Sequence, residues 1–251
     1  MRLPRRRPLR IALIVALLLA CGLLGALIFF AMPSGEVMPE ARAALESDAS
    51  VQASRGDWLT FMPTARQPAA GFILYPGGRV APEAYAPLGR DLAEAGYLAV
   101  ITPMPLNLAI LHIDAASAVI NAHPQIERWV IGGHSLGGSM AARYAHANPE
   151  QIAGLALLAA YPEAHIDFSQ RDLPVVSVYG ELDGLATTAE IEASFSLLPA
   201  DANTVRIDGG NHAQFGWYGA QAGDNPAQIS HQQQHKQVVT ATLRLLDASG
   251  S

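Results

Sequence analysis

The stretch Trp129-Val130-Ile131-Gly132-Gly133-His134-Ser135-Leu136-Gly137-Gly138 is an apolar run that breaks at glycines around one serine. Residues 129–131 are apolar and predict a buried strand. Residues 139–146, which end shortly before Asn148-Pro149, predict a helix. Ser135 therefore lies at a predicted turn from strand to helix.

The glycines on either side of Ser135 have a physical reason. A serine on such a tight turn has a strained backbone, and side chains at positions 133 and 137 would collide with neighbouring backbone. The turn exposes the serine hydroxyl and points the Leu136 amide, at the positive end of the helix dipole, to where an oxyanion develops. The pattern predicts a nucleophilic serine. The alternative is an ordinary glycine turn with a passive serine, since the chain has 22 glycines.

Composition and charge favour one folded domain after an N-terminal segment. Half of the 251 residues are apolar, which is enough for one sizeable core. The formal net charge is −6. Five of the 16 basic residues nevertheless lie in the first ten positions, and no run of Lys or Arg follows. A nucleic-acid partner is therefore not expected.

The N-terminal segment has the pattern of a membrane anchor. Residues 11–32 contain no charged side chain and are long enough to cross a bilayer as a helix. The basic residues 1–10 predict a cytoplasmic tip and an extracytoplasmic location for the rest of the chain. A cleavable signal peptide is the alternative, but its apolar region is usually only about 7–15 residues long. The single cysteine, Cys21, lies inside the apolar run, so the exported part contains no internal disulfide.

The remaining chain divides into a linker and a domain at 49–251. Residues 33–48 predict the linker, and residues 51–54 and 58–62 predict a hairpin. After Pro68, strands and helices alternate. Further strands are predicted at 71–75, 98–102, 129–131, 152–159, 174–179 and 204–207, and helices at 82–95, 108–122, 139–146, 191–198 and 230–246, the last with a Ser230–Gln233 capping box. This order predicts an α/β fold with a mainly parallel sheet, helices on both faces and binding loops at the carboxyl ends of the strands.

The order of elements and the turn Gly133-His134-Ser135-Leu136-Gly137 resemble the α/β-hydrolase superfamily over residues 49–247, with an esterase-like core similar to that of dienelactone hydrolases. The stretch 211–219 is similar to a little-characterised bacterial branch. Members carry a triad in the chain order Ser, acid, His. The resemblance implies Ser135 as nucleophile, Asp183 as acid and His212 as base. Glu181 and Asp208 are the competitors of Asp183.

The family takes a second oxyanion amide from the loop after an early strand. That loop reads Tyr75-Pro76-Gly77-Gly78-Arg79, so the resemblance implies the amide of Gly77 or Gly78 beside that of Leu136. A plain turn is the alternative. The His-Gly-Gly-Gly form of lipases is absent.

Substrate and cofactor expectations are less specific. Only residues 161–173 separate the two strands between which related enzymes often insert a lid, so we expect an open, shallow site for small or chain-end acyl groups. Phe215, Trp217 and Tyr218 follow the predicted base and either line that site or pack its loop. His231 and His235 have the spacing of a metal pair, but no acidic third ligand is nearby, and neither a metal nor an organic cofactor is expected.

These features together predict a membrane-anchored serine hydrolase of carboxylic esters or thioesters, whose partner is a small acyl ester. Two alternatives stay open. One is an acyltransferase with the same triad, and the other is a non-catalytic binding module with the same fold. The sequence does not fix the oligomeric state.

Overall fold

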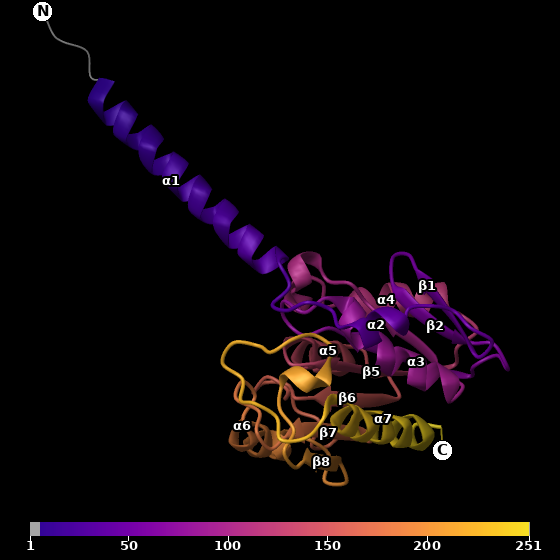
Figure 1. Ribbon diagram of the computed structural model, residues 1–251. Coiled ribbons are helices and arrows are strands. Elements are labelled where there is room, and N and C mark those ends of the chain that lie inside the picture. The colour runs from indigo at the N-terminus through magenta and orange to yellow at the C-terminus, as the bar shows by residue number, and fades with distance from the viewer. Residues whose placement is uncertain (1–5, 251) are drawn as a thin grey trace, which may run out of the picture.

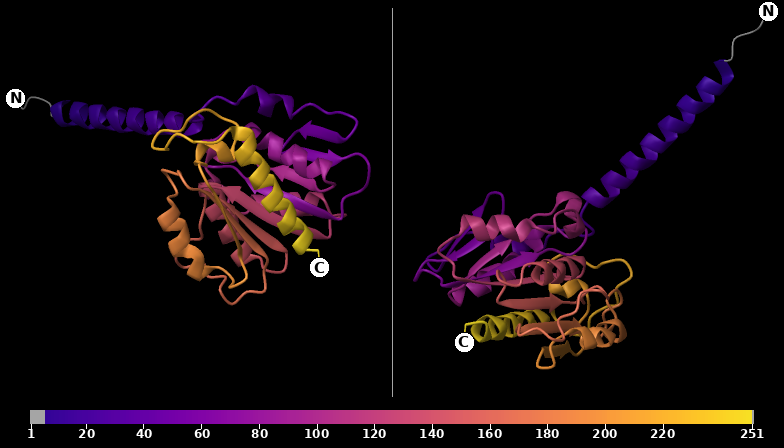
Figure 2. Two further views of the ribbon diagram at one scale, coloured as in Figure 1. Left: turned by 60° about the horizontal axis from the view of Figure 1, so that its bottom comes forward. Right: turned by 180° about the vertical axis from the view of Figure 1, so that it is seen from behind.

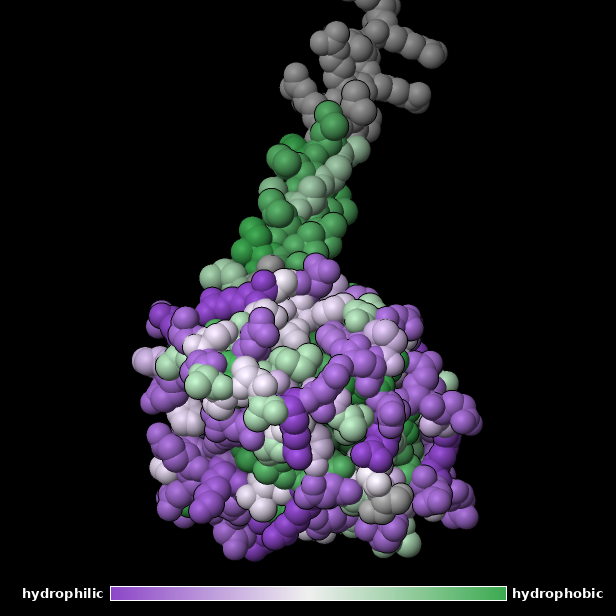
Figure 3. Space-filling view, turned by 90° about the vertical axis from the view of Figure 1, so that its right-hand side faces the viewer, coloured by the Kyte–Doolittle hydropathy of each residue, from purple (hydrophilic) through white to green (hydrophobic). Residues whose placement is uncertain are grey.

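A computed structural model describes residues 6–250, which form a long N-terminal helix and one α/β domain (Figure 1). Helix α1 (Arg6–Ala31) projects away from the domain. Its segment Ile11–Phe29 is long and apolar enough to cross a membrane, and none of it is buried against the domain. In Figure 3 this helix is the apolar element above a mainly hydrophilic face.

The domain is built on one eight-stranded sheet in the order β1-β2-β4-β3-β5-β6-β7-β8. Strands β1 and β2 form the predicted hairpin, β2 is also antiparallel to β4, and all other pairs are parallel. The strands are β1 (Val51–Arg55), β2 (Leu59–Pro63), β3 (Ala70–Tyr75), β4 (Leu98–Ile101), β5 (Arg128–His134), β6 (Gly154–Leu158), β7 (Val175–Gly180) and β8 (Asn203–Ile207). The predicted α/β architecture is therefore confirmed.

Helices cover both faces of the sheet, as Figure 2 shows. One apolar core lies between the sheet and helices α3 (Ala86–Glu94) and α7 (His231–Ala248). The other lies under α4 (Ala115–Ala122) and α5 (Leu136–Ala147). Helix α6 (Thr188–Ala193) contacts β7. The capping box of Ser230 and Gln233 at the start of α7 is present.

Four parts of the chain differ from the sequence-based expectation. The predicted linker contains a short helix α2 (Pro39–Ala43), and its residues Ala41, Ala44 and Leu45 are buried. The helix expected at 82–95 is split into a 3₁₀ turn η1 (Pro82–Tyr85) and α3. Similarly, the helix expected at 191–198 is displaced to α6 followed by a 3₁₀ turn, η4 (Ser194–Leu197).

The fourth difference is the start of the helix expected at 108–122. Only residues 115–122 form α4, and the preceding stretch contains two 3₁₀ turns, η2 (Pro105–Asn107) and η3 (Ala109–Leu111). Within the expected range, Leu108 is extended, with φ of −126° and ψ of 107°, and His112 has φ of −152° and ψ of 60°. An α-helix cannot pass through such residues, so the apolar side chains of this stretch lie on an irregular loop.

Strand register aligns the carboxyl ends of the parallel strands. Tyr75 of β3 pairs with Gly133 of β5, and Gly180 of β7 pairs with Ile207 of β8. The loops that follow these strands carry all of the triad and oxyanion residues inferred from the sequence. The sheet therefore gathers them along one edge of the domain.

Candidate active site

Ser135 is the turn residue between β5 and α5. Its backbone has φ of 53° and ψ of −124°, outside the regions that side-chain-bearing residues normally adopt. Its carbonyl accepts from the amides of Gly138 and Ser139, which starts α5 directly. The residue is half-buried. The backbone strain expected at this turn is therefore present.

The two flanking glycines have no room for a side chain. A Cβ on Gly133 would lie 2.4 Å from the carbonyl carbon of Gly137, and a Cβ on Gly137 would lie 2.2 Å from the Tyr75 carbonyl oxygen. Both obstacles are backbone atoms that no side-chain rotation removes. The close packing of α5 on β3 and β5 thus requires glycine at these positions.

The structure brings Asp183 and His212 together. His212 Nδ1 lies 2.7 Å from Asp183 Oδ2, and both side chains are almost fully buried. The other carboxylate oxygen, Oδ1, accepts from the amides of Leu185 and Ala186 at 2.8 and 2.7 Å. An ionised carboxylate only accepts, so Nδ1 of His212 donates and its Nε2 is left as the basic nitrogen.

The competing carboxylates have other contacts. Glu181 accepts from the Gly209 amide at 2.9 Å, and Asp208 forms an exposed ion pair with Arg206 at 2.9 Å. Among the described residues, the Ser135 hydroxyl forms no hydrogen bond, so the hydrogen bond expected between a nucleophilic serine and His212 is not formed in this structure. Such contacts often tighten only when substrate is bound.

Asp224 is a residue of the site that the sequence analysis missed. Its Oδ1 accepts from the amides of Gly184 and His212 at 3.1 and 3.3 Å, and its Oδ2 accepts from the Ala213 amide at 2.8 Å. One carboxylate thereby fixes the loop of the acid and the loop of the base. No motif marks Asp224, since it lies in an irregular segment before α7.

Two glycine amides are candidates for the oxyanion site, and one of them already donates a hydrogen bond within the protein. The Gly77 amide donates to the Tyr85 hydroxyl at 3.0 Å, whereas the Gly78 amide has no recorded partner in the part of the chain that the structure describes. The Leu136 amide, at the start of α5, is likewise unpaired among those residues. The Gly77 amide is therefore engaged within the protein, and the amides of Gly78 and Leu136 stay the predicted oxyanion donors.

We call residues 75–79, at the carboxyl end of β3, the oxyanion loop. The Tyr85 hydroxyl links this loop to His134. Its oxygen accepts from the Gly77 amide, and the same hydroxyl shares a hydrogen bond with His134 Nδ1, 2.8 Å away. The His134 ring is fully buried and lies 4.4 Å, centre to centre, from the His212 ring. Burial first, and the charge of His212 second, lower the pKa of His134 well below its usual value. His134 is thus a neutral neighbour of the candidate base.

Phe215, Trp217 and Tyr218 are core residues, exposed by only 5%, 5% and 1%. The ring of Phe215 stacks on His134, and Trp217 packs against His231 and His235. The Tyr218 hydroxyl donates to Gln221 at 2.8 Å. Of the two roles open from the sequence, these contacts favour packing.

His231 and His235 have separate partners. His231 Nε2 lies 3.0 Å from the Gly216 carbonyl oxygen, and His235 Nε2 lies 2.8 Å from Asp91 Oδ2. Within the described residues, no group of three or more His, Cys, Asp or Glu side chains is placed to hold a metal ion.

The linker from α1 contacts the loop after β3 and the loop after β8. The amide and hydroxyl of Ser34 donate to the Arg79 carbonyl at 2.7 and 3.1 Å. The Met38 amide donates to the Trp217 carbonyl at 2.9 Å, and Val37 forms a β-bridge with Tyr218. Residues 34–38 thus connect the oxyanion loop to the loop of His212.

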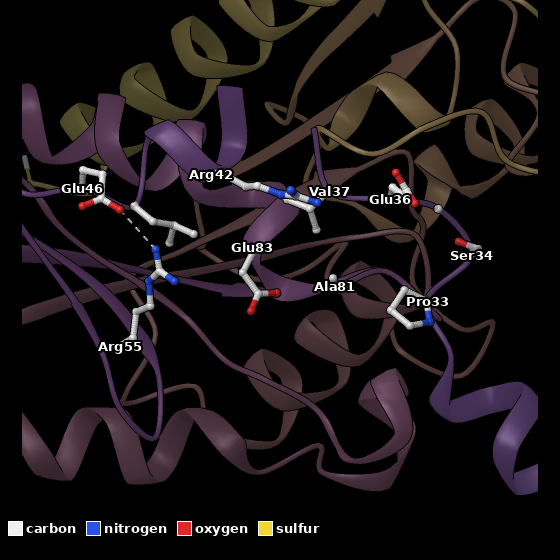
Figure 4. A pocket seen from close by; sticks show the side chains of 11 residues that line it. Pro33, Ser34, Glu36, Val37, Arg42, Glu46, Arg55, Ala81 and Glu83 are labelled. Carbon is white, nitrogen blue, oxygen red and sulfur yellow. Dashed lines mark ion pairs between the residues drawn. The ribbon is translucent and has the colours of Figure 1, made fainter. Parts of the chain in front are cut away.

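A cavity of about 790 Å³ adjoins this linker, as Figure 4 shows. It is lined by Glu83, Arg42 and the ion pair of Arg55 with Glu46, whose nitrogen and oxygen lie 3.6 Å apart. None of the triad residues lines it. This cavity is therefore separate from the candidate reaction centre.

Comparisons with known proteins agree with this architecture. Residues 71–236, more than half of the chain, match the model of a family described as the alpha/beta hydrolase family. No curated protein matches the chain. Among solved structures, a predicted CIB-like hydrolase from Thermoplasma acidophilum is similar, with a TM-score of 0.58 and 14% identity over 79% of this chain and 98% of that one. At this identity the likeness shows the fold alone.

Proposed function

Because this chain belongs to the alpha/beta hydrolase family, we propose that it is a membrane-anchored serine hydrolase that cleaves carboxylic esters through an acyl-enzyme. The observation that carries the proposal is the buried 2.7 Å contact of His212 with Asp183, together with a serine held at φ 53° at the same edge of the sheet. A passive glycine turn would require neither a strained serine nor a buried acid–base pair beside it.

The reaction would proceed in two halves. His212 removes the Ser135 proton as the hydroxyl oxygen attacks the ester carbon, and the amides of Gly78 and Leu136 stabilise the oxyanion. The carbon–oxygen bond to the alcohol then breaks, and His212 returns the proton to that alcohol. Water, deprotonated by His212, next attacks the acyl-serine and releases the acid. Asp183 orients the imidazole and stabilises its protonated form.

Helix α1 supports the location of the enzyme. Its apolar segment Ile11–Phe29 would span the bilayer, with the arginine-rich residues 1–10 in the cytoplasm and the catalytic domain outside.

Labelling with a fluorophosphonate probe tests the activated serine. The full chain should be labelled, and Ser135→Ala should abolish labelling, while Asp183→Asn and His212→Ala should slow it strongly. Asp208→Asn is the matched control, because this carboxylate lies near the base but is exposed, and it should label like the wild type. Absence of labelling of the folded wild type would refute the catalytic proposal.

A further inference from the structure

The end of α1 lies against the oxyanion loop. The guanidinium carbon of Arg79 is 3.7 Å from the centre of the Phe29 ring, and Arg79 directly follows Gly78. Figures 1 and 2 show α1 leaving the domain beside the loops at the carboxyl edge of the sheet. The last residue of the apolar span therefore contacts a residue next to an oxyanion donor.

The short connection keeps this edge of the domain near the end of the span. Ser34 is bonded twice to the Arg79 carbonyl, and the chain from Phe29 to Ser34 extends at most about 18 Å. If α1 crosses a bilayer, the oxyanion loop stays within about that distance of the hydrocarbon boundary, whatever the tilt of the domain. The headgroup layer itself is several ångströms thick.

An apolar loop lies at the same place. Residues 95–113 carry no Asp, Glu, Lys or Arg, and Ile110 and Leu111 are 51% and 53% exposed. The loop is fixed to the oxyanion loop, because the Arg79 amide donates to the Asn107 carbonyl at 2.8 Å. The turn η2 also contacts α1. These exposed side chains are thus neighbours of the anchor.

Leu185, on the loop of Asp183, adds a third exposed apolar side chain at this edge, with 37% exposure. Beyond α1 and Met32, Ile110, Leu111 and Leu185 are the large apolar residues that the structure shows as exposed in the described chain. We call these three residues the apolar rim. Single exposed apolar residues are common, but here all three lie on the loops that surround the candidate reaction centre.

Resting on the proposed hydrolase function, we propose that the carboxyl edge of the domain is seated on the lipid headgroups, with the apolar rim inserted, and that the substrate is an ester of a long acyl chain held in the bilayer. The contact of α1 with η2, in the loop that carries Ile110 and Leu111, selects a lipid surface as the occupant of the rim. Arg79 lies where a long basic side chain prefers to be, with its head at the membrane–water boundary.

This proposal also explains why the site is open. Between β6 and β7 the chain forms neither a helix nor a strand, so no lid domain encloses an acyl chain. A chain that remains in the bilayer needs no enclosing pocket, because the lipid tails already surround it. The enzyme then has to reach only the ester group, and water releases the acid and the alcohol.

Paired substrates test the proposal with the full chain in phospholipid nanodiscs. One substrate is p-nitrophenyl palmitate within the nanodisc, and the other is p-nitrophenyl butyrate in solution, so the leaving group is constant. Ile110→Glu/Leu111→Glu should lower the ratio of palmitate to butyrate turnover at least tenfold, because ionised side chains resist insertion.

The matched control is Gln67→Glu/Gln125→Glu, which adds the same charge at exposed positions before β3 and β5, at the opposite edge of the sheet. Its ratio should stay within twofold of the wild type. An unchanged ratio in the rim variant, or an equal fall in both variants, would overturn the membrane-seated substrate. Turnover of neither ester by the wild type would instead refute the proposed function.

A second readout does not depend on activity. Ile110→Trp and Gln125→Trp are compared in nanodiscs whose lipids carry bromine near the headgroup end of the acyl chains. We expect Ile110→Trp to be quenched at least twice as strongly, since the native tryptophans contribute equally to both variants. Equal quenching would show that the rim does not enter the bilayer.

Discussion

The imidazole of His134 packs against that of His212, with ring centres 4.4 Å apart and the planes inclined by 46°. In the proposed reaction His212 becomes positively charged, and a second positive charge at this distance would oppose that step. The burial of His134 keeps it neutral, since its pKa lies well below the usual value. The residue before the serine thus sets the electrostatic environment of the base.

The neutrality of His134 makes stability depend on pH. Its pKa is lowered in the folded state, so below about pH 6.5 the unfolded chain binds a proton that the native chain does not. The free energy of unfolding therefore falls with decreasing pH, by no more than about 1.4 kcal/mol per pH unit from this group. Urea unfolding of wild type and His134→Gln between pH 7 and pH 5 should show a shallower fall in the variant. Parallel curves would contradict the assignment.

Removing the Tyr85 hydroxyl should destabilise the domain. In Tyr85→Phe the Gly77 amide and His134 Nδ1 both lose a buried partner, which costs about 1–3 kcal/mol of unfolding free energy. Tyr161→Phe is the control, because no hydrogen bond of that hydroxyl is recorded within residues 6–250. Chemical denaturation measures both, and equal stability of the two variants would show that the Tyr85 link is not needed.

Asp224→Asn should impair catalysis, although Asp224 is not one of the three proposed triad residues. An amide side chain has one accepting oxygen, so at least one of the amides of Gly184, His212 and Ala213 loses its partner. The acid and base loops then move relative to each other, and we expect kcat/KM to fall about tenfold or more, which corresponds to ~1.4 kcal/mol. Steady-state ester hydrolysis measures the fall. A value like that of Asp208→Asn would show that Asp224 does not position the site.

The sequence predicted the parts of the fold that follow from local patterns. Hydrophobic runs and the spacing of Gly133, Ser135 and Gly137 were sufficient for the alternating order and the elbow, because the steric demand of that turn is local. The capping box of α7 is equally local, and it is confirmed. The roles of Asp183 and His212 came from the family resemblance. The structure places their side chains in contact, and their catalytic roles stay predictions.

The remaining features depend on contacts between distant residues. Residues 108–114 belong to a predicted helix, but the extended backbone of Leu108 and the non-helical backbone of His112 interrupt it. Asp224 reaches Gly184 across 40 positions, and no spacing rule connects them. The contact of the His134 ring with His212 likewise depends on how β5 packs against the loop after β8, and no local pattern in the sequence predicts it.

Adjacent glycines in the oxyanion loop should respond differently to alanine. A Cβ on Gly77 would lie 2.7 Å from His134 Nδ1 and 3.0 Å from the Tyr85 hydroxyl, both of which are buried and fixed. A Cβ on Gly78 would meet the side chain of Leu136, at 3.3 Å, and that of Leu108, at 4.0 Å. Gly77→Ala should therefore lower the free energy of unfolding by about 1–3 kcal/mol, as overpacked cores do, while Gly78→Ala should change it by less than about 1 kcal/mol.

Activity should separate the same two variants. The clash in Gly77→Ala displaces His134, which packs against the candidate base, so probe labelling of Ser135 should slow together with the loss of stability. Gly78→Ala retains the backbone amide, and its labelling rate should change less than that of Gly77→Ala. If Gly77→Ala were as stable and as reactive as Gly78→Ala, the chain of contacts from Gly77 through Tyr85 to His134 would not hold the base in place.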